Sequence, residues 1–157
     1  MARTRAVSLA DGAAAGLSLA VVAAEYNEHI VSQLLAGARG AWRALGGADA
    51  GLRVTHVPGA FELPLVAQRL IRSGKTDAVV ALGCVIRGDT PHFDYVAGEC
   101  AAGLQRVMLD TGVPVIFGVL TTENEAQAVE RAAPDRMNKG GEAVRTAIAM
   151  ARLLRAI

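Results

Sequence analysis

Apolar runs alternate with segments of helical periodicity along most of the chain. Four runs of small and branched apolar residues have the length of buried strands. These predicted strands cover residues 17–24, 51–57, 77–86 and 113–122. Elsewhere, apolar residues recur every three or four positions, which is typical of helices with one buried face. These predicted helices cover residues 28–45, 61–74, 92–112, 123–133 and 139–157.

Local signals agree with these boundaries. Pro64 falls in the first turn of the helix at 61–74, where proline is tolerated, and Gly74 closes that helix. Thr121 or Thr122 is placed to cap the helix that starts at residue 123. Pro134 then interrupts the pattern, which predicts a break before the last long helix.

Strands that alternate with helices predict a parallel sheet covered on both faces. We therefore expect a single domain over residues 1–157, built as a three-layer α/β/α sandwich with a four-stranded, flavodoxin-like parallel sheet. Residues 1–16 are expected to be a loose leader or an interface segment. Their arginines and small apolar residues mimic a secretory signal, but Asp11 and Gly12 split the run, and the apolar segment at 17–24 is too short to span a bilayer.

Composition narrows the function classes. Of 157 residues, 52% are hydrophobic and 20% are charged, which is typical of a globular protein. The formal net charge of +1 gives no reason to expect nucleic acid or an anionic membrane as a partner. Cys84 and Cys100 lack the spacing of metal ligands, so we expect two reduced, buried thiols, no metal site, and a cytoplasmic protein.

In open parallel sheets, ligands bind at the carboxyl ends of the strands. The segment "RGDTPH" follows the strand at 77–86, and Gly88 would let backbone approach a ligand closely. Thr90 is a plausible cap, with Pro91 at the first helical position, so free N–H groups could bind an anion such as phosphate. The alternative is a capping turn that binds only water. His92 is either a proton-transfer residue or an ordinary surface histidine.

Two other strand ends carry residues with two interpretations. Glu62 either stabilises the start of its helix or grips a polyol or amide. Tyr26 either offers a face for stacking or packs in the core or at an interface. Arg131 and Lys139 lie beyond the last strand, and their spacing alone does not bring them to His92.

Five segments, in this order and spacing, together resemble the 6,7-dimethyl-8-ribityllumazine synthase family. They are "EYNEHI", "VPGAFELP", "GCVIRGDTPHFDYV", "PVIFGVLTTEN", and "QAVER" followed by "NKGGEA". The resemblance covers the chain from about Leu19 to Arg152. It implies a transferase that acts in the penultimate step of riboflavin synthesis. The implied reaction condenses 5-amino-6-(D-ribitylamino)uracil with 3,4-dihydroxy-2-butanone 4-phosphate, without a metal or organic cofactor.

The resemblance also implies site residues. Those implied for the ribitylaminouracil are Tyr26, Asn27, Ala60, Phe61, Glu62, Cys84, Val85, Ile86, Phe117 and Lys139. Among them, Tyr26 would stack on the pyrimidine, and backbone at 84–86 would read the uracil edge. Those implied for the butanone phosphate are Asp89, Thr90 and Arg131, with His92 as the proton-transfer residue. Phe117 and Arg131 match positions that the family supplies from an adjacent subunit.

A shared site implies a homo-oligomer. The family forms pentamers, some of which close into icosahedral shells of sixty subunits, and riboflavin synthase is a further implied partner. The chain departs from the family at Tyr26, where phenylalanine or tryptophan is common, and at 133–137. In that loop, Asp135 beside a phosphate site would be unfavourable unless Arg136 offsets it. Arg87 looks like a phosphate ligand, but the matching gives that role to Arg131.

Three rival functions can be compared with this one, and the presence of both His92 and Arg131 favours the enzyme. A non-catalytic flavin or lumazine carrier would keep Tyr26 and Glu62 but would not need His92 or Arg131. A shell protein with a vestigial pocket would need neither His92 nor Arg131. A flavodoxin-type electron carrier predicts a phosphate loop after the first strand, and "EYNEHI" has no glycine or hydroxyl run there.

Overall fold

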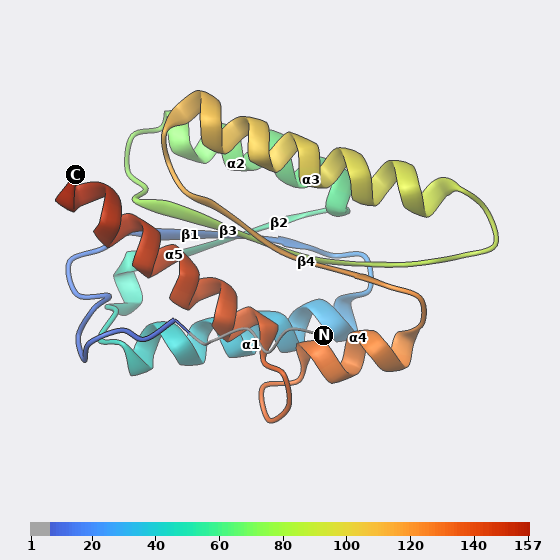
Figure 1. Ribbon diagram of the computed structural model, residues 1–157, viewed down its shortest axis with the longest axis horizontal. Coiled ribbons are helices and arrows are strands. Elements are labelled where there is room, and N and C mark those ends of the chain that lie inside the picture. The colour runs from blue at the N-terminus through green and yellow to red at the C-terminus, as the bar shows by residue number, and fades with distance from the viewer. Residues whose placement is uncertain (1–6) are drawn as a thin grey trace.

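The computed structural model describes residues 7–157, which form a parallel sheet between two layers of helices (Figure 1). The strands are β1 (Leu19–Ala24), β2 (Leu52–Val57), β3 (Ala78–Ile86) and β4 (Val115–Thr122). The helices are α1 (Glu28–Ala44), α2 (Leu63–Arg72), α3 (His92–Thr111), α4 (Glu125–Ala132) and α5 (Lys139–Ala156), with 3-10 turns η1 (Asp49–Gly51) and η2 (Ala60–Glu62). The predicted three-layer, flavodoxin-like fold is confirmed.

The strand order β2-β1-β3-β4 places the carboxyl ends of β1 and β3 side by side. From β1 the chain continues to β2 on one side of it and then crosses to β3 on the other side, so a topological switch point lies between β1 and β3. Pairing between β1 and β3 ends at Ala23 and Leu82, whereas pairing between β3 and β4 continues to Ile86 and Thr122. The last residues of β3 therefore project beyond β1.

Alternation along the strands divides the core in two. Val21 and Val80 point toward α1 and α5, and Val22 and Val79 point toward α2 and α3. All four side chains are fully buried. In Figure 1, α2 and α3 cover one face of the sheet, and α1, α4 and α5 cover the other. Both faces of the central strands are thus apolar, which explains their uninterrupted apolar runs.

Two predicted helix starts need correction. The cap of α4 is Asn124, whose Oδ1 accepts from the N–H of Gln127 at 2.9 Å, and not Thr121 or Thr122. The reason is that Thr122 still pairs with Ile86 in the sheet. At α3, Pro91 precedes the helix instead of opening it, although Thr90 Oγ1 accepts from the N–H of His92 at 3.4 Å.

The segment before β1 is held more tightly than the sequence predicts. Arg152 on α5 donates from Nε to the carbonyl of Ala13 at 2.8 Å and from an Nη to the carbonyl of Ala15 at 2.6 Å. Ala14 is fully buried, and its N–H donates to the carbonyl of Leu45. The expectation for residues 1–6 lies outside the described residues. Among residues 7–157, no helix has both the length and the apolar character needed to cross a membrane.

Candidate active site

A cavity of about 780 Å³ opens where the carboxyl ends of β1, β2 and β3 meet the start of α3. Its volume lies within the usual range of small-molecule sites. Most of the residues predicted for the site line it: Tyr26, Asn27, Ala60, Phe61, Glu62, Cys84, Val85, Ile86, Thr90 and His92. The structure thus brings together three turns that are far apart in the sequence.

The turn after β1 is fixed by backbone and side chain together. The N–H of Tyr26 donates to the carbonyl of Pro58 at 3.0 Å, which ties the turn to the end of β2. Asn27 adopts a left-handed backbone conformation with φ 58°, and its Nδ2 donates to the carbonyl of Cys84 at 2.9 Å. Tyr26 remains 74% exposed, so its ring is available at the cavity.

The end of β3 offers the cavity an open backbone edge. Successive residues of a strand point their backbone groups to opposite edges. The N–H of Arg87 donates to Thr122 on β4, and the carbonyl of Cys84 accepts from Asn27 on the β1 side. It follows that the backbone groups of Ile86 also point to the β1 side, beyond the last residues that pair with β1, and those of Val85 point to β4.

The turn before α3 is exposed and polar. Gly88, Thr90 and His92 line the cavity. Asp89, predicted for the phosphate site, lies in the same turn but does not line the cavity. One helical turn further, Tyr95 and Val96 line it as well; they were not predicted from the sequence, although their spacing from His92 places them on the same face of the helix.

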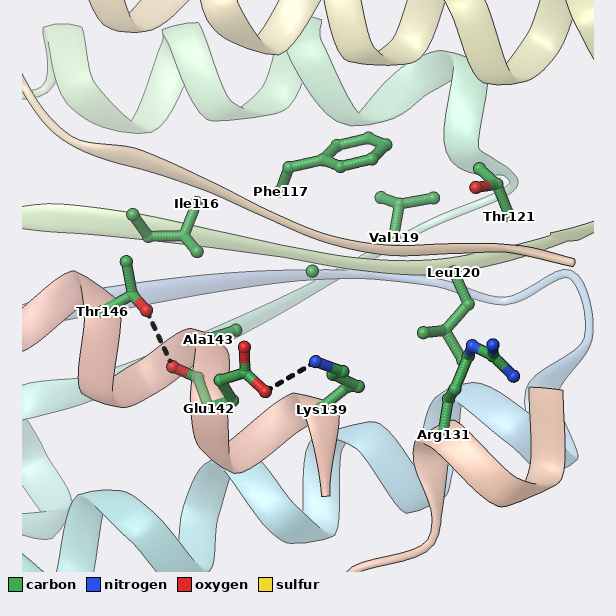
Figure 2. A pocket seen from close by; sticks show the side chains of 11 residues that line it. Ile116, Phe117, Val119, Leu120, Thr121, Arg131, Lys139, Glu142, Ala143 and Thr146 are labelled. Atoms are coloured by element: carbon green, nitrogen blue, oxygen red, sulfur yellow. Dashed lines mark hydrogen bonds and ion pairs between the residues drawn. The ribbon is translucent and has the colours of Figure 1, made fainter. Parts of the chain in front are cut away.

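Phe117, Arg131 and Lys139 lie elsewhere, in a second pocket of about 340 Å³ at the β4 edge of the sheet. Figure 2 shows Phe117 on one face of β4 and the two cations near the other face, on α4 and α5. The two pockets share no lining residue. Within one chain, therefore, these three residues are not part of the cavity around His92.

The two pockets also differ in charge. None of the described side chains that line the cavity at the strand ends is a lysine or an arginine. In the pocket at β4, the Lys139 Nζ lies 2.7 Å from a carboxylate oxygen of Glu142, a residue that was not predicted for the site (Figure 2). Within residues 7–157, Arg131 pairs with no carboxylate; its Nη1 donates to the backbone carbonyl of Gln127 at 3.1 Å.

The loop at 133–137 does not disturb that pocket. Asp135 is exposed and does not line it. Arg136 pairs with Glu130 at 2.6 Å instead of offsetting Asp135. The departure in sequence is therefore accommodated at the surface.

The cysteines are buried, as predicted. Cys84 is 3% exposed, and burial, with a smaller contribution from the charge of Glu125, raises the pKa of its thiol to about 11. Burial alone raises the pKa of the Cys100 thiol to about 11. At neutral pH both thiols are protonated, so neither is suited to act as a nucleophile.

The chain is similar in sequence to known proteins of one family. The model of a family described as 6,7-dimethyl-8-ribityllumazine synthase matches residues 16–155. Two proteins named 6,7-dimethyl-8-ribityllumazine synthase, from two strains of Thermus thermophilus, are each 55% identical over 144 residues. The alignments cover 92% of this chain and 92% of each relative.

Proposed function

The chain belongs to the 6,7-dimethyl-8-ribityllumazine synthase family, and from that membership we propose where its substrates bind and which residues act on them. It is an enzyme of riboflavin biosynthesis. Its reaction joins 5-amino-6-(D-ribitylamino)uracil to 3,4-dihydroxy-2-butanone 4-phosphate, with loss of phosphate and water. Imine formation, phosphate elimination and ring closure are the chemical steps that the site must support.

The pyrimidine is proposed to bind between the exposed ring of Tyr26 and the open edge of β3. A flat, polar heterocycle needs an aromatic face and hydrogen bonds along its edge. The N–H and carbonyl of Ile86 supply a donor and an acceptor beyond the point where β1 pairs with β3, while Val85 contributes its side chain. The open backbone edge beside an exposed aromatic ring is the observation that carries this proposal.

The ribityl chain is proposed to lie along the turn at residues 60–62. Phe61 is 58% exposed and Glu62 is exposed, and both line the cavity. A carboxylate accepts hydrogen bonds from hydroxyls, and backbone N–H groups at the start of α2 can donate. This combination suits a polyol.

Proton transfer is assigned to His92. Imine formation and ring closure each require protons to be added and removed, and histidine is suited to that task near neutral pH. His92 lies at the exposed start of α3 and lines the cavity beside Thr90. Thr90 and Asp89 share the turn proposed for the phosphate substrate.

The leaving phosphate needs a cation, and no lysine or arginine is among the described residues that line the cavity. Charge that grows on a leaving group is stabilised by fixed donors, and a guanidinium can bind phosphate through two hydrogen bonds. Arg131 has no carboxylate partner among the described residues and lies in the pocket at β4, beside Phe117 and Lys139. We therefore assign Phe117, Arg131 and Lys139 to the active site of a neighbouring copy of the chain.

This assignment makes the functional unit a homo-oligomer. In a closed ring, the cavity of each subunit would face the β4 edge of the next, which is a heterologous contact that closes by rotation. A pentamer, alone or within a shell, is the proposed assembly, on a single-domain subunit. Because the reaction is the penultimate step of riboflavin synthesis, riboflavin synthase is a proposed partner protein.

The test of this function is the formation of the lumazine from the two substrates, followed by its absorbance. The proposal expects turnover by the purified protein without added metal. No product at micromolar enzyme concentration would favour a carrier or a shell protein instead.

A further inference from the structure

Arg87 lies at the junction of β3, β4 and α3. Its backbone N–H extends the ladder by donating to the carbonyl of Thr122 at 2.9 Å. Its Nε lies 2.9 Å from a carboxylate oxygen of Glu123, and its Nη1 lies 3.3 Å from one of Asp94. The guanidinium carbon is 4.3 Å from the ring centre of Phe93, which is close enough for a cation–π contact.

These contacts connect two separate elements. Glu123 follows β4 directly, whereas Phe93 and Asp94 belong to the first turn of α3, immediately after His92. Phe93 also lines the cavity. One planar group therefore ties the first turn of α3 to the end of β4, across the turn at 88–91.

The turn that leads into α3 has few buried contacts. Residues 88–92 are all exposed, and Gly88 has open space around its Cα. The first fully buried side chain of α3 is that of Cys100, two helical turns beyond His92. Core packing of α3 thus begins at Val96 and is complete at Cys100, and the Arg87 contacts hold the turn that precedes Val96.

Arg87 is poorly suited to bind phosphate itself. Two carboxylates already accept from its guanidinium, and they would repel an incoming anion. The planar shape of the guanidinium matters as well as its charge, because its N–H groups reach two carboxylates while one face covers the Phe93 ring.

We propose that Arg87 is a positioning residue for the reaction: it holds the first turn of α3 so that His92 meets the substrates in a productive orientation. The inference rests on the proposed function of His92. Small errors in orientation are costly to catalysis, and misplacement by about 1 Å can lower turnover by about 100-fold.

The test compares Arg87→Gln, Arg87→Lys and a control, Arg106→Gln, in the full-length enzyme. Arg106 lies on α3, and within residues 7–157 its one ion pair is with Asp110, at 3.4 Å; its side chain is 83% exposed. We expect Arg87→Gln to lower kcat by about 10- to 100-fold while the KM for each substrate changes by less than about threefold. Arg87→Lys should recover little of the lost kcat, because an ammonium cannot bind both carboxylates and cover the ring as the planar guanidinium does. Arg106→Gln should match the wild type.

A double-mutant cycle shows whether the effect passes through His92. In the His92→Ala background, Arg87→Gln should lower kcat by less than about twofold more, because the residue being oriented is gone. A full, multiplicative loss in that background would overturn the proposal. The proposal would also be overturned if Arg87→Gln raised the KM for the phosphate substrate and Arg87→Lys returned it to the wild-type value, since that pattern indicates a phosphate ligand.

Hydrogen exchange tests the positioning without turnover. In Arg87→Gln, exchange of the hydrogen-bonded amides in the first turns of α3, at Asp94 and residues 96–99, should rise by about tenfold, while exchange over residues 100–107 stays at the wild-type rate. Unchanged exchange at Asp94 and residues 96–99 would overturn the proposal. If the wild type forms no lumazine, the proposed function fails, and the exchange result still decides whether Arg87 holds this turn.

Discussion

Asn27 and Cys84 are joined across 57 residues of sequence by a hydrogen bond of 2.9 Å from Nδ2 to the backbone carbonyl. This bond closes the gap between β1 and β3 at the point where their pairing ends. It also leaves the groups of Ile86 as the next unpaired backbone on that edge. The backbone edge of the proposed pyrimidine site therefore depends on a side chain from the turn after β1.

Substitution of Asn27 tests this arrangement. Asn27→Gly keeps the left-handed backbone accessible but removes the bond, so it should cost about 1–3 kcal/mol of stability. Asn27→Ala adds the strain of φ 58° and should cost about 1 kcal/mol more. Both should raise the KM for the pyrimidine substrate. Urea unfolding and steady-state kinetics measure these effects. If the alanine variant were as stable as the glycine variant, the backbone strain expected at this position would be ruled out.

His92→Ala should lower kcat by about 10²- to 10⁴-fold, the usual contribution of a general acid or base. His29→Ala is the matched control, because His29 is an exposed histidine whose Nε2 lies 2.7 Å from a carboxylate oxygen of Glu125, away from the cavity. It should stay within about a factor of two of the wild type. If His92→Ala retained that much activity, an essential role in proton transfer would be ruled out.

The pattern of buried strands was sufficient to predict the sheet, because both faces of β1 and β3 are apolar and their runs are continuous. The three turns of the cavity were also predictable, since the carboxyl ends of parallel strands meet at one edge. Tyr26, Glu62 and His92 were found in this way.

Other features depend on contacts that the sequence does not encode locally. The cap at Asn124 was missed because β4 runs through Thr122, and only its partner Ile86 fixes that end. Glu142 was missed because its role depends on the direction of the Lys139 side chain. The partners of Arg87 include Glu123, which is 36 residues away, so spacing could not reveal them.

The motif "NKGG" has a packing role that can be tested. Gly140 lies against the backbone of Leu34 where α5 meets α1, and a Cβ there would overlap the Leu34 carbonyl. Gly140→Ala should destabilise the protein by about 1–3 kcal/mol. Gly40→Ala, at a helical glycine with open space, should instead stabilise it by up to about 1 kcal/mol. Equal changes in the urea midpoint for the two variants would contradict the packing role.

The buried thiols predict a loss of stability in alkali. An unfolded thiol ionises near its ordinary pKa of 9.0, whereas the folded thiols of Cys84 and Cys100 ionise near 11. The contribution of the two protonated thiols to the free energy of unfolding is therefore complete below pH 9 and is lost as the pH rises from 9 to 11. It amounts to roughly 2–3 kcal/mol for each thiol.

Cys100→Ala isolates this effect, because Cys100 lies outside the cavity. The free energy of unfolding of this variant should fall less steeply between pH 9 and 11 than that of the wild type. The measurement is urea unfolding across that range. Parallel curves for the two proteins would show that the Cys100 thiol does not titrate as described.

The central claim is that one chain contributes His92 to one active site and Arg131 to another. His92→Ala and Arg131→Ala each damage a different half of the site, so each homo-oligomer should be nearly inactive. When the two variants form mixed rings, some interfaces combine an intact His92 with an intact Arg131. When the two variants mix at random in equal amounts, about one quarter of all sites have both residues intact.

The most direct measurement is therefore lumazine formation by oligomers assembled from equal amounts of His92→Ala and Arg131→Ala subunits, by co-expression or by joint refolding. A site shared between subunits predicts recovery to about one quarter of wild-type activity. Activity no higher than the average of the two separate variants, in oligomers shown to contain both, would contradict it.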